Sequence, residues 1–260
     1  MMTKKNKKSV DKSISMMYNI LNKLRKRGKF KMSRTKEMMM VLDTETANSV
    51  EEPLPYDIGW VVCDRHGNIY ETRSFIVAEI FLDMRDVMSS AYYAEKIPMY
   101  WEDIKSGNRK IMTMWNIRKV MIEDMKKYKV KKVGAYNMAF DKRALNNLIR
   151  YVSKSFKRWW FPFGTTYFCI WNMACEVLLD SNTYRRFCDK NGFKSECGNY
   201  QTSAEIAYRY ITEKTDFVES HTGLEDVFIE VDIMAKCYKR KKKMTGVINP
   251  ACWRKVQRKR

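Results

Sequence analysis

Two carboxylates placed two residues apart are the first feature of the sequence that points to chemistry. Asp43 and Glu45 follow the apolar run Met38–Leu42. On a strand, residues i and i+2 point to the same side, so these carboxylates would repel each other unless a cation lay between them. Hard divalent cations such as Mg²⁺ bind carboxylate oxygens. The pair therefore indicates a metal site at the end of a buried strand. A strand that merely ends in a polar turn is the structural alternative.

Two further aspartates and a histidine stand where helices are expected to begin. Asp141 follows the end of the strand expected over Lys131–Ala135, and Asp226 lies five residues after His221. Aspartate is favoured at helix N-termini by capping and by the helix dipole, so each acid taken alone has a structural explanation. A lone histidine is likewise more often structural than catalytic. The ordinary pKa of histidine, about 6.5, nevertheless suits proton transfer near neutral pH.

The elements that would position these residues alternate between strands and helices. Short apolar runs bounded by turn residues predict strands, and apolar residues at a spacing of three to four predict helices. Two strands on either side of Asp64–Asn68 indicate a hairpin, and the overall order predicts a mixed α/β sheet covered by helices. The expected strands are Met38–Asp43, Asp57–Cys63, Ile69–Val77, Lys131–Ala135 and Thr165–Ile170. The expected helices are 80–128 with breaks, Asp141–Lys154, Ser203–Ile211 and Glu225–Tyr238.

The net charge of +20 is distributed unevenly along the chain. Residues 1–36 carry a net charge of +12 and residues 236–260 a net charge of +11, which leaves −3 for residues 37–235. Strongly basic proteins usually bind polyanions such as nucleic acid, and less often anionic membranes. An acidic body between two basic ends is typical of an enzyme that gathers carboxylates around metal ions. Met16–Leu24 also predicts a short basic amphipathic helix. It is interpreted as a nucleic-acid arm in preference to a membrane-surface helix, and a helix that packs on the body is the structural alternative.

The cysteines and the hydropathy pattern bear on the compartment. Seven cysteines without a CxxC pair favour reduced thiols over a disulfide framework or a zinc site. No apolar run approaches the roughly 18 residues of a membrane span, and no unbroken apolar stretch follows the basic N-terminus. These features predict a cytoplasmic protein without a membrane partner, in a bacterial cell or a phage-infected host.

The order and local contexts of the acidic residues form three motifs, which together resemble the DEDDh 3′→5′ exonuclease family. That family includes the proofreading subunit of the bacterial replicative polymerase, ribonuclease T and oligoribonuclease. The matches are Leu42-Asp43-Thr44-Glu45-Thr46 with Asp57-Ile58-Gly59 downstream, then Asn137, Phe140, Asp141 and Leu145, and finally His221, Leu224 and Asp226. Thr222 stands where the subtype with tyrosine in place of histidine has its tyrosine, so the histidine subtype is the better match.

The resemblance implies a ribonuclease H-like α/β fold, with a mixed five-stranded sheet flanked by helices. It implies two Mg²⁺ or Mn²⁺ ions held by Asp43, Glu45, Asp141 and Asp226, with His221 as general base. It further implies that a 3′ end of DNA or RNA, single-stranded at that end, is shortened to nucleoside 5′-monophosphates. The candidates for substrate contact are Thr44, Thr46, Ala47, Tyr136, Asn137 and Phe140. Because several members of the family form dimers, a homodimer is a further possibility, as is a replication or repair partner.

The resemblance covers residues 38–240 and divides the chain into three parts. These are a basic N-terminal extension (1–36), an exonuclease domain (37–240) and a basic C-terminal tail (241–260). The long gaps between motifs predict insertions within 78–132 and 150–215. In the second of these, Trp159–Phe163 follows two basic residues and is interpreted as a packing cluster, with base stacking as the alternative.

Three other functions remain open from the sequence. A ribonuclease H-like endonuclease would also gather carboxylates, but it gives no reason for a histidine five residues before Asp226. A nucleic-acid-binding protein on an inactive nuclease fold is disfavoured because the four carboxylates and the histidine are all present. A protein that binds membranes or partners through its basic ends would lose its function if both ends were removed, whereas an enzyme would retain weakened turnover.

Overall fold

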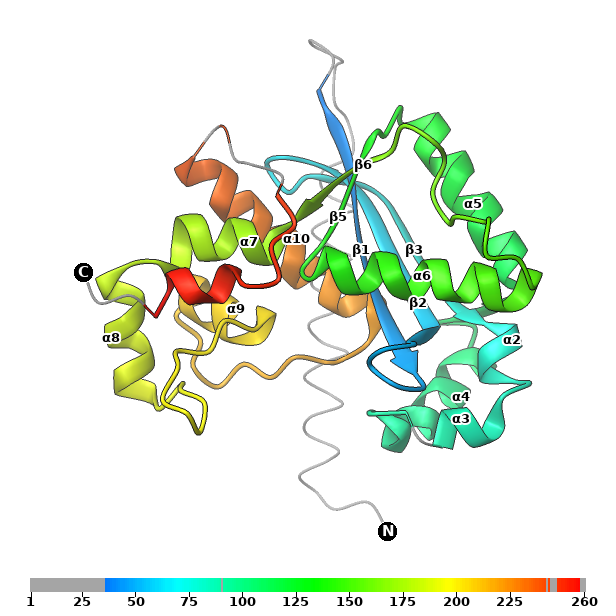
Figure 1. Cartoon of the computed structure of the whole chain (residues 1–260), viewed down its shortest axis with the longest axis horizontal. Helices are drawn as coiled ribbons and strands as arrows, with labels where there is room; N and C mark the ends of the chain where they lie inside the picture. The colour runs from blue at the N-terminus through cyan, green and yellow to red at the C-terminus, as the bar shows by residue number, and fades with distance from the viewer. Residues whose placement is uncertain (1–35, 90, 242, 244–246, 258–260) are drawn as a thin grey trace. The chain divides into compact units, whose positions relative to one another are not determined.

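A mixed sheet, six-stranded within the described residues, lies at the centre of the fold (Figure 1). The computed structural model describes residues 36–89, 91–241, 243 and 247–257, so the helix predicted within Met16–Leu24 lies outside them. The strands are β1 (Met38–Ala47), β2 (Leu54–Asp64), β3 (Ile69–Val77), β4 (Lys110–Met112), β5 (Lys132–Ala135) and β6 (Thr166–Cys169). Their order across the sheet is β4-β3-β2-β1-β5-β6.

The strand pairing combines an antiparallel meander with parallel additions. β1 pairs antiparallel with β2, and β2 pairs antiparallel with β3. β5 runs parallel to both β1 and β6. The predicted hairpin is present, and the backbone N–H of Gly67 donates to the carbonyl of Asp64 at 3.0 Å in its turn. The mixed α/β architecture predicted from the sequence is confirmed.

The segment between β3 and β5 differs from the helical run expected over 80–128. It is divided into short helices and the strand β4, which pairs parallel with Phe75–Val77 and brings the sheet to one strand more than expected. Three residues carry too little pattern to predict a strand, and β4 forms because the edge of β3 offers unpaired backbone groups. The helices of this segment are α2 (Ala78–Phe81), α3 (Arg85–Ser89), η1 (Ala94–Lys96), α4 (Ile97–Lys105) and α5 (Met114–Lys127).

Helices cover both faces of the sheet. The later helices are α6 (Met138–Ser153), α7 (Ile170–Ala174), the π-helical turn η2 (Cys175–Leu179), α8 (Asn182–Asn191), α9 (Ala204–Thr212), α10 (Gly223–Arg240) and η3 (Cys252–Lys255). Figure 1 shows α5 and α6 on one side of the sheet and α7, α9 and α10 on the other. Within the described residues, every helix is too short or too polar to cross a membrane.

The side chains of β1 alternate between two hydrophobic cores. Met40 and Leu42 pack in the core shared with α5 and α6. Met39 and Val41 pack in the core shared with α7, α9 and α10. Because side chains alternate strictly along a strand, the next residues of β1 divide in the same way. Asp43 is thereby directed toward α10.

Part of the segment expected to be a basic C-terminal tail is packed into the second core. Cys252 and Val256 are fully buried there, and Nε of Arg185 donates to the carbonyl of Val256 at 2.9 Å. Arg254 lies exposed between them. Cys252 and Val256 therefore pack on the domain, while Arg254 faces solvent.

Candidate active site

Three carboxylates converge at the end of β1. Asp43 and Glu45 occupy alternate positions of β1, and Asp226 lies in the first turn of α10. An oxygen of each carboxylate lies within 4.8 Å of the others. Asp43 is half-buried, whereas Glu45 and Asp226 are buried. Three like charges this close and this shielded from water are suited to hold a divalent cation.

The fourth predicted carboxylate reaches the same strand end from the other face of the sheet. Asp141 lies in the first turn of α6 and is buried. Its Oδ1 accepts hydrogen bonds from the backbone N–H of Thr44 at 3.2 Å and from the hydroxyl of Thr44 at 2.9 Å. Its negative charge also acts on Asp43 and Glu45. Asp141 is therefore adjacent to the three-carboxylate group, and its hydrogen bonds to Thr44 connect it to the strand that carries Asp43 and Glu45.

A close approach of two backbones places Asp226 beside β1. A Cβ on Gly59 of β2 would lie 2.4 Å from both the carbonyl carbon of Gly223 and the nitrogen of Leu224. Only glycine allows the first turn of α10 to pack so closely on the sheet. The carboxylate of Asp57 accepts the backbone N–H of Gly223 at 3.1 Å, which satisfies a free donor at the start of the helix.

Arg109 connects this helix start to the rest of the fold. Its Nη1 donates to Asp57 at 3.0 Å, and its Nη2 donates to Glu225 at 2.8 Å. The hydroxyl of Tyr100 donates to the same oxygen of Asp57 at 2.9 Å. The guanidinium of Arg109 is almost fully buried, and a buried arginine requires such partners. Arg109 and Tyr100 both belong to the segment predicted to be an insertion, which therefore supports the position of Asp226.

His221 lies on the loop that leads into α10, in a conformation held by neighbours. Its φ is +49°, a left-handed value uncommon for residues other than glycine. The ring of Tyr93 stacks on the imidazole, with ring centres 4.3 Å apart and planes at 15°. The ammonium of Lys96 donates to the carbonyls of Ser220 and His221, in the latter case at 3.3 Å. These contacts fix both the ring and the backbone of His221.

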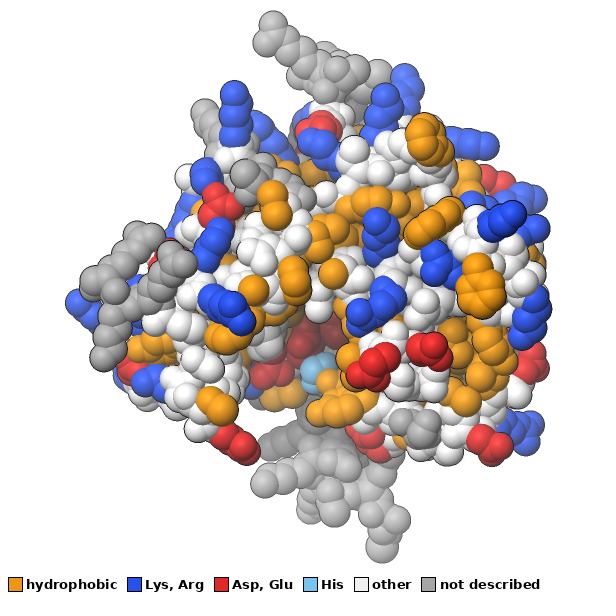
Figure 2. Space-filling model, viewed as in Figure 1, with side chains coloured by type: hydrophobic (Ala, Val, Ile, Leu, Met, Phe, Trp, Pro, Cys, Tyr) orange, Lys and Arg blue, Asp and Glu red, His pale blue; other side chains and the backbone are white. Residues whose placement is uncertain are grey.

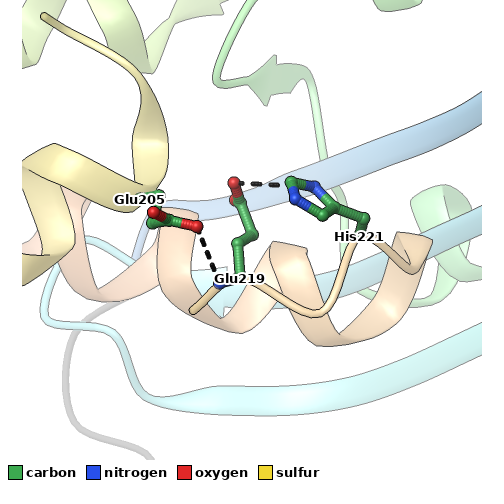
Figure 3. Close-up of side chains that lie close together, drawn as sticks. All are labelled: Glu205, Glu219 and His221. Atoms are coloured by element: carbon green, nitrogen blue, oxygen red, sulfur yellow. Dashed lines mark hydrogen bonds and ion pairs between the residues drawn. The ribbon is translucent and has the colours of Figure 1, made fainter. Parts of the chain in front are cut away.

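A second group of ionisable side chains, Glu205, Glu219 and His221, adjoins the first (Figure 3). Glu219 lies between the other two, with Oε2 3.9 Å from Nδ1 of His221. Glu205 accepts the backbone N–H of Glu219 at 3.0 Å and pairs with Arg209 at 2.6 Å. Because Glu205 already has a cationic partner, the group is better described as a support for His221 than as a second metal centre.

The pKa values of the four carboxylates are all raised above their ordinary values. Burial raises the pKa of Glu45 to about 8, with Asp57 as the next cause. Burial also raises the pKa of Asp226 to about 9, with Glu219 next, and that of Asp141 to about 7. The pKa of Asp43 is raised by burial and then by Asp141. Ionising all four groups together is therefore unfavourable without a cation, which fits a divalent metal site.

Burial and the positive charge of Lys96 lower the pKa of His221 below its usual value. Its imidazole is therefore neutral at neutral pH. A neutral imidazole is the form that accepts a proton.

Glu230 is a buried carboxylate that the sequence reasoning missed. It lies one helical turn after Asp226 on α10 and is 2% exposed. Its Oε2 has no hydrogen-bond partner, and its charge acts on Asp43. The sequence did contain a signal for this residue: Glu230 lies four residues after Asp226, and so on the same side of the helix, among apolar residues. Lys96 and Tyr93, also missed, carry no local signal because they reach His221 only through the fold.

The residues predicted to contact substrate differ in how far the structure exposes them to solvent. The side chain of Thr44 is buried against Asp141, and Ala47 is fully buried. Thr46 and Phe140 are half-buried, and Asn137 is exposed at the start of α6. The hydroxyl of Tyr136 donates to the carbonyl of Thr202 at 2.7 Å. All six lie at the ends of β1 and β5 or at the start of α6. Figure 2 shows acidic side chains and a histidine together in a recess of the surface.

Comparison with solved structures relates this fold to a nuclease. The structure of E. coli exonuclease I in complex with a 5cy-dT13 oligonucleotide is similar, with a TM-score of 0.50 and 12% identity over 80% of this chain and 41% of that chain. The same enzyme in complex with a dA16 oligonucleotide gives a TM-score of 0.47 and 12% identity over 80% and 42%. This chain thus spans less than half the length of these neighbours. No protein-family model matches the chain, and no curated protein matches it. The likeness shows the fold, which is the expected ribonuclease H-like one.

Proposed function

We propose that this chain is a metal-dependent 3′→5′ exonuclease of the DEDDh type that releases nucleoside 5′-monophosphates. The observation that carries the proposal is the meeting of Asp43, Glu45 and Asp226 within 4.8 Å at the end of β1. Asp141 joins them through Thr44, and His221 precedes Asp226 on a loop held by several contacts. The five residues come from four separate elements, and chance does not readily bring four carboxylates together with so little exposure to solvent.

The four carboxylates would hold two Mg²⁺ or Mn²⁺ ions. Such ions lower the pKa of a bound water and stabilise charge on the leaving oxygen. Asp43, Glu45 and Asp226 would provide oxygen ligands, and Thr44 orients the carboxylate of Asp141. The neutral imidazole of His221 would accept the proton of the attacking water, and stacking by Tyr93 keeps the ring in one orientation.

Single-stranded DNA is the favoured substrate within this proposal. The neighbour with a TM-score of 0.50 was determined with a dT13 oligonucleotide, which supports a single strand and deoxyribose. The exposed Asn137 and the half-buried Thr46 and Phe140 would line the place of the terminal nucleotide. Cytoplasmic location belongs to the same proposal and is supported by seven cysteines that are all free.

The test uses 5′-labelled DNA and RNA oligonucleotides with Mg²⁺, with Mn²⁺ and with chelator. We expect a ladder that shortens from the 3′ end and requires metal, and that is absent for Asp226→Asn, which keeps the shape of the side chain. Release of long internal fragments would instead identify an endonuclease. If oligonucleotides are bound but not cleaved with either metal, the chain is a binding protein on an inactive nuclease fold.

A further inference from the structure

A surface patch of aromatic and arginine side chains lies away from the carboxylates, on α5 and the segment after α6. Arg150 belongs to α6, Arg118 belongs to α5, and Arg158 and Trp159 follow α6. The guanidinium of Arg150 lies 4.6 Å from the ring centre of Trp159, and that of Arg158 lies 5.2 Å from the ring centre of Trp115. We refer to these five residues as the Trp–Arg patch.

The two tryptophans of the patch are exposed to solvent, whereas the tryptophan next to one of them in the sequence is buried. Trp159 is 58% exposed and Trp115 is 40% exposed. Trp160, the next residue, is 1% exposed and donates from its backbone to Asn146 at 3.0 Å. Within Trp159–Phe163, which is interpreted from the sequence as a packing cluster, Trp160 thus packs in the core and Trp159 does not. Exposed tryptophan loses stabilisation that burial would supply, so a surface that keeps two of them indicates a binding function.

The three arginines of the patch have no carboxylate partner among the described residues. Within the described part of the chain, no carboxylate pairs with Arg118, Arg150 or Arg158. Arg118 instead donates to the carbonyl of Trp160 at 2.6 Å, and Nε of Arg150 is buried without a partner. The charge of Arg158 lowers the pKa of Arg118, second to burial, which shows that the groups repel each other. An external anion would relieve that repulsion.

The sequence around the patch is also strongly basic. Residues 142–175 contain six lysines and arginines and no aspartate or glutamate. Phe156 and Phe163 are 88% and 108% exposed in the same segment. Figure 2 shows Lys and Arg side chains among hydrophobic ones on the side of α5 and α6. Aromatic rings that alternate with arginines without a carboxylate partner suit a single-stranded nucleic acid. Its bases can stack on the rings, and its phosphates can pair with the guanidinium groups.

We propose that the Trp–Arg patch binds single-stranded nucleic acid outside the catalytic site, through stacking on Trp115 and Trp159 and phosphate contacts from the three arginines. The identity of the ligand rests on the proposed function, because the same strand would be the substrate. The patch would hold a part of the strand that is not being cleaved, so it should contribute to the affinity of long strands and not of short ones.

The test measures binding by fluorescence anisotropy in chelator, where no cleavage takes place. The probe is a labelled thymidine oligonucleotide of about 20 nucleotides, longer than a typical single-strand site, compared with a tetranucleotide. We expect Trp159→Ala to weaken binding of the long strand about tenfold, as for the loss of one stacked base, and Trp159→Phe to retain most of the affinity. Arg158→Glu should weaken it similarly, whereas Arg186→Glu, the same charge change on the exposed face of α8, should not.

Two results would overturn the proposal. One is equal affinity of the wild type, Trp159→Ala and Arg158→Glu for the long strand. The other is displacement of the strand by polyglutamate with no effect of Trp159→Ala, which would assign the patch to acidic protein segments. The test does not depend on turnover. A protein that binds through the patch and never cleaves DNA would contradict only the proposed function, and an active enzyme with a neutral patch would contradict only this inference.

Discussion

The backbone N–H and the hydroxyl of Thr44 both donate to one carboxylate oxygen of Asp141, at 3.2 and 2.9 Å, across 97 residues of sequence. Through this contact the strand that carries Asp43 and Glu45 orients an acid from a helix on the opposite face. Thr44 is one of the residues predicted to contact the substrate. Its N–H and its hydroxyl donate to Asp141, so under the proposed function Thr44 would position a metal ligand.

Replacement of Thr44 by valine should weaken metal binding while the fold is kept. Valine keeps the shape of threonine but removes the hydroxyl that orients Asp141 and lowers its pKa. Loss of such a contact behind a metal ligand typically reduces metal affinity about 10- to 100-fold. The half-saturating Mn²⁺ concentration for cleavage should rise by that factor. Thr44→Ser, which keeps the hydroxyl, is the matched control, and an unchanged metal requirement in Thr44→Val would contradict the role.

The Lys96 side chain should set both the position and the basicity of His221. It donates to the carbonyl of His221 at 3.3 Å, and its charge lowers the pKa of the imidazole, second to burial. Lys96→Met should therefore raise the pKa of His221 and move the acid limb of the rate profile to higher pH. Because the ring would also lose its fixed position, we expect the kcat to fall about 10- to 100-fold.

The chain contains only two histidines, so a titration followed by nuclear magnetic resonance can report on His221 directly. The His221→Ala variant assigns the two signals. Lys96→Arg keeps the positive charge and serves as the control for the pKa shift. A His221 pKa that stays unchanged in Lys96→Met would show that the lysine acts only on the backbone.

Alanine in place of Gly59 should destabilise the whole domain. Its Cβ would lie 2.4 Å from the backbone of Gly223 and Leu224, and a helix backbone cannot move away without carrying Asp226 with it. We expect a loss of more than about 3 kcal/mol in the free energy of unfolding, at the upper end for overpacking. The measurement is urea denaturation followed by far-ultraviolet circular dichroism.

Gly134→Ala is the matched comparison for that substitution. Its Cβ would also meet atoms closer than 3 Å, but these belong to the ring of Phe168, the outer end of a side chain. The ring can turn aside, so the loss of stability should be smaller than for Gly59→Ala. Equal losses would mean that the contact of β2 with α10 is not especially tight.

The metal-free protein should become less stable as the pH rises. Burial raises the pKa values of Asp141, Glu45 and Asp226 to about 7, 8 and 9. Since the folded state binds these protons more tightly than the unfolded state, the stabilisation is complete at low pH and is lost as the pH rises through those values. In chelator we expect the Tm to fall from pH 6 to pH 9.

Added Mg²⁺ should reverse this trend, because it binds the ionised carboxylates and competes with protons. The gain in Tm from Mg²⁺ should be larger at pH 8 than at pH 6. Asp226→Asn removes the carboxyl whose pKa is raised to about 9, so its Tm should depend less on pH and respond less to Mg²⁺. A gain from Mg²⁺ that is the same at both pH values would argue against a carboxylate metal site.

Much of the fold could be predicted because its signals are local. The strand expected over Ile69–Val77 is found with the same bounds, and the strand expected over Lys131–Ala135 is found as Lys132–Ala135. Period-two alternation and apolar runs bounded by turn residues decide such elements through neighbours in sequence. The short edge strand Lys110–Met112 has no such pattern and depends on an edge that only the sheet provides.

The sequence by itself determined the residue types of the site, their order and the elements that carry them. It identified Asp43, Glu45 and Asp226 from motifs, and the tertiary structure then brought their carboxylates within 4.8 Å of one another. Only the tertiary structure decided what surrounds them. Tyr93, Lys96 and Arg109 come from a segment without motifs and act through contacts across more than 100 residues. Such contacts leave no local pattern, because burial, stacking and charge depend on distance in space rather than along the chain.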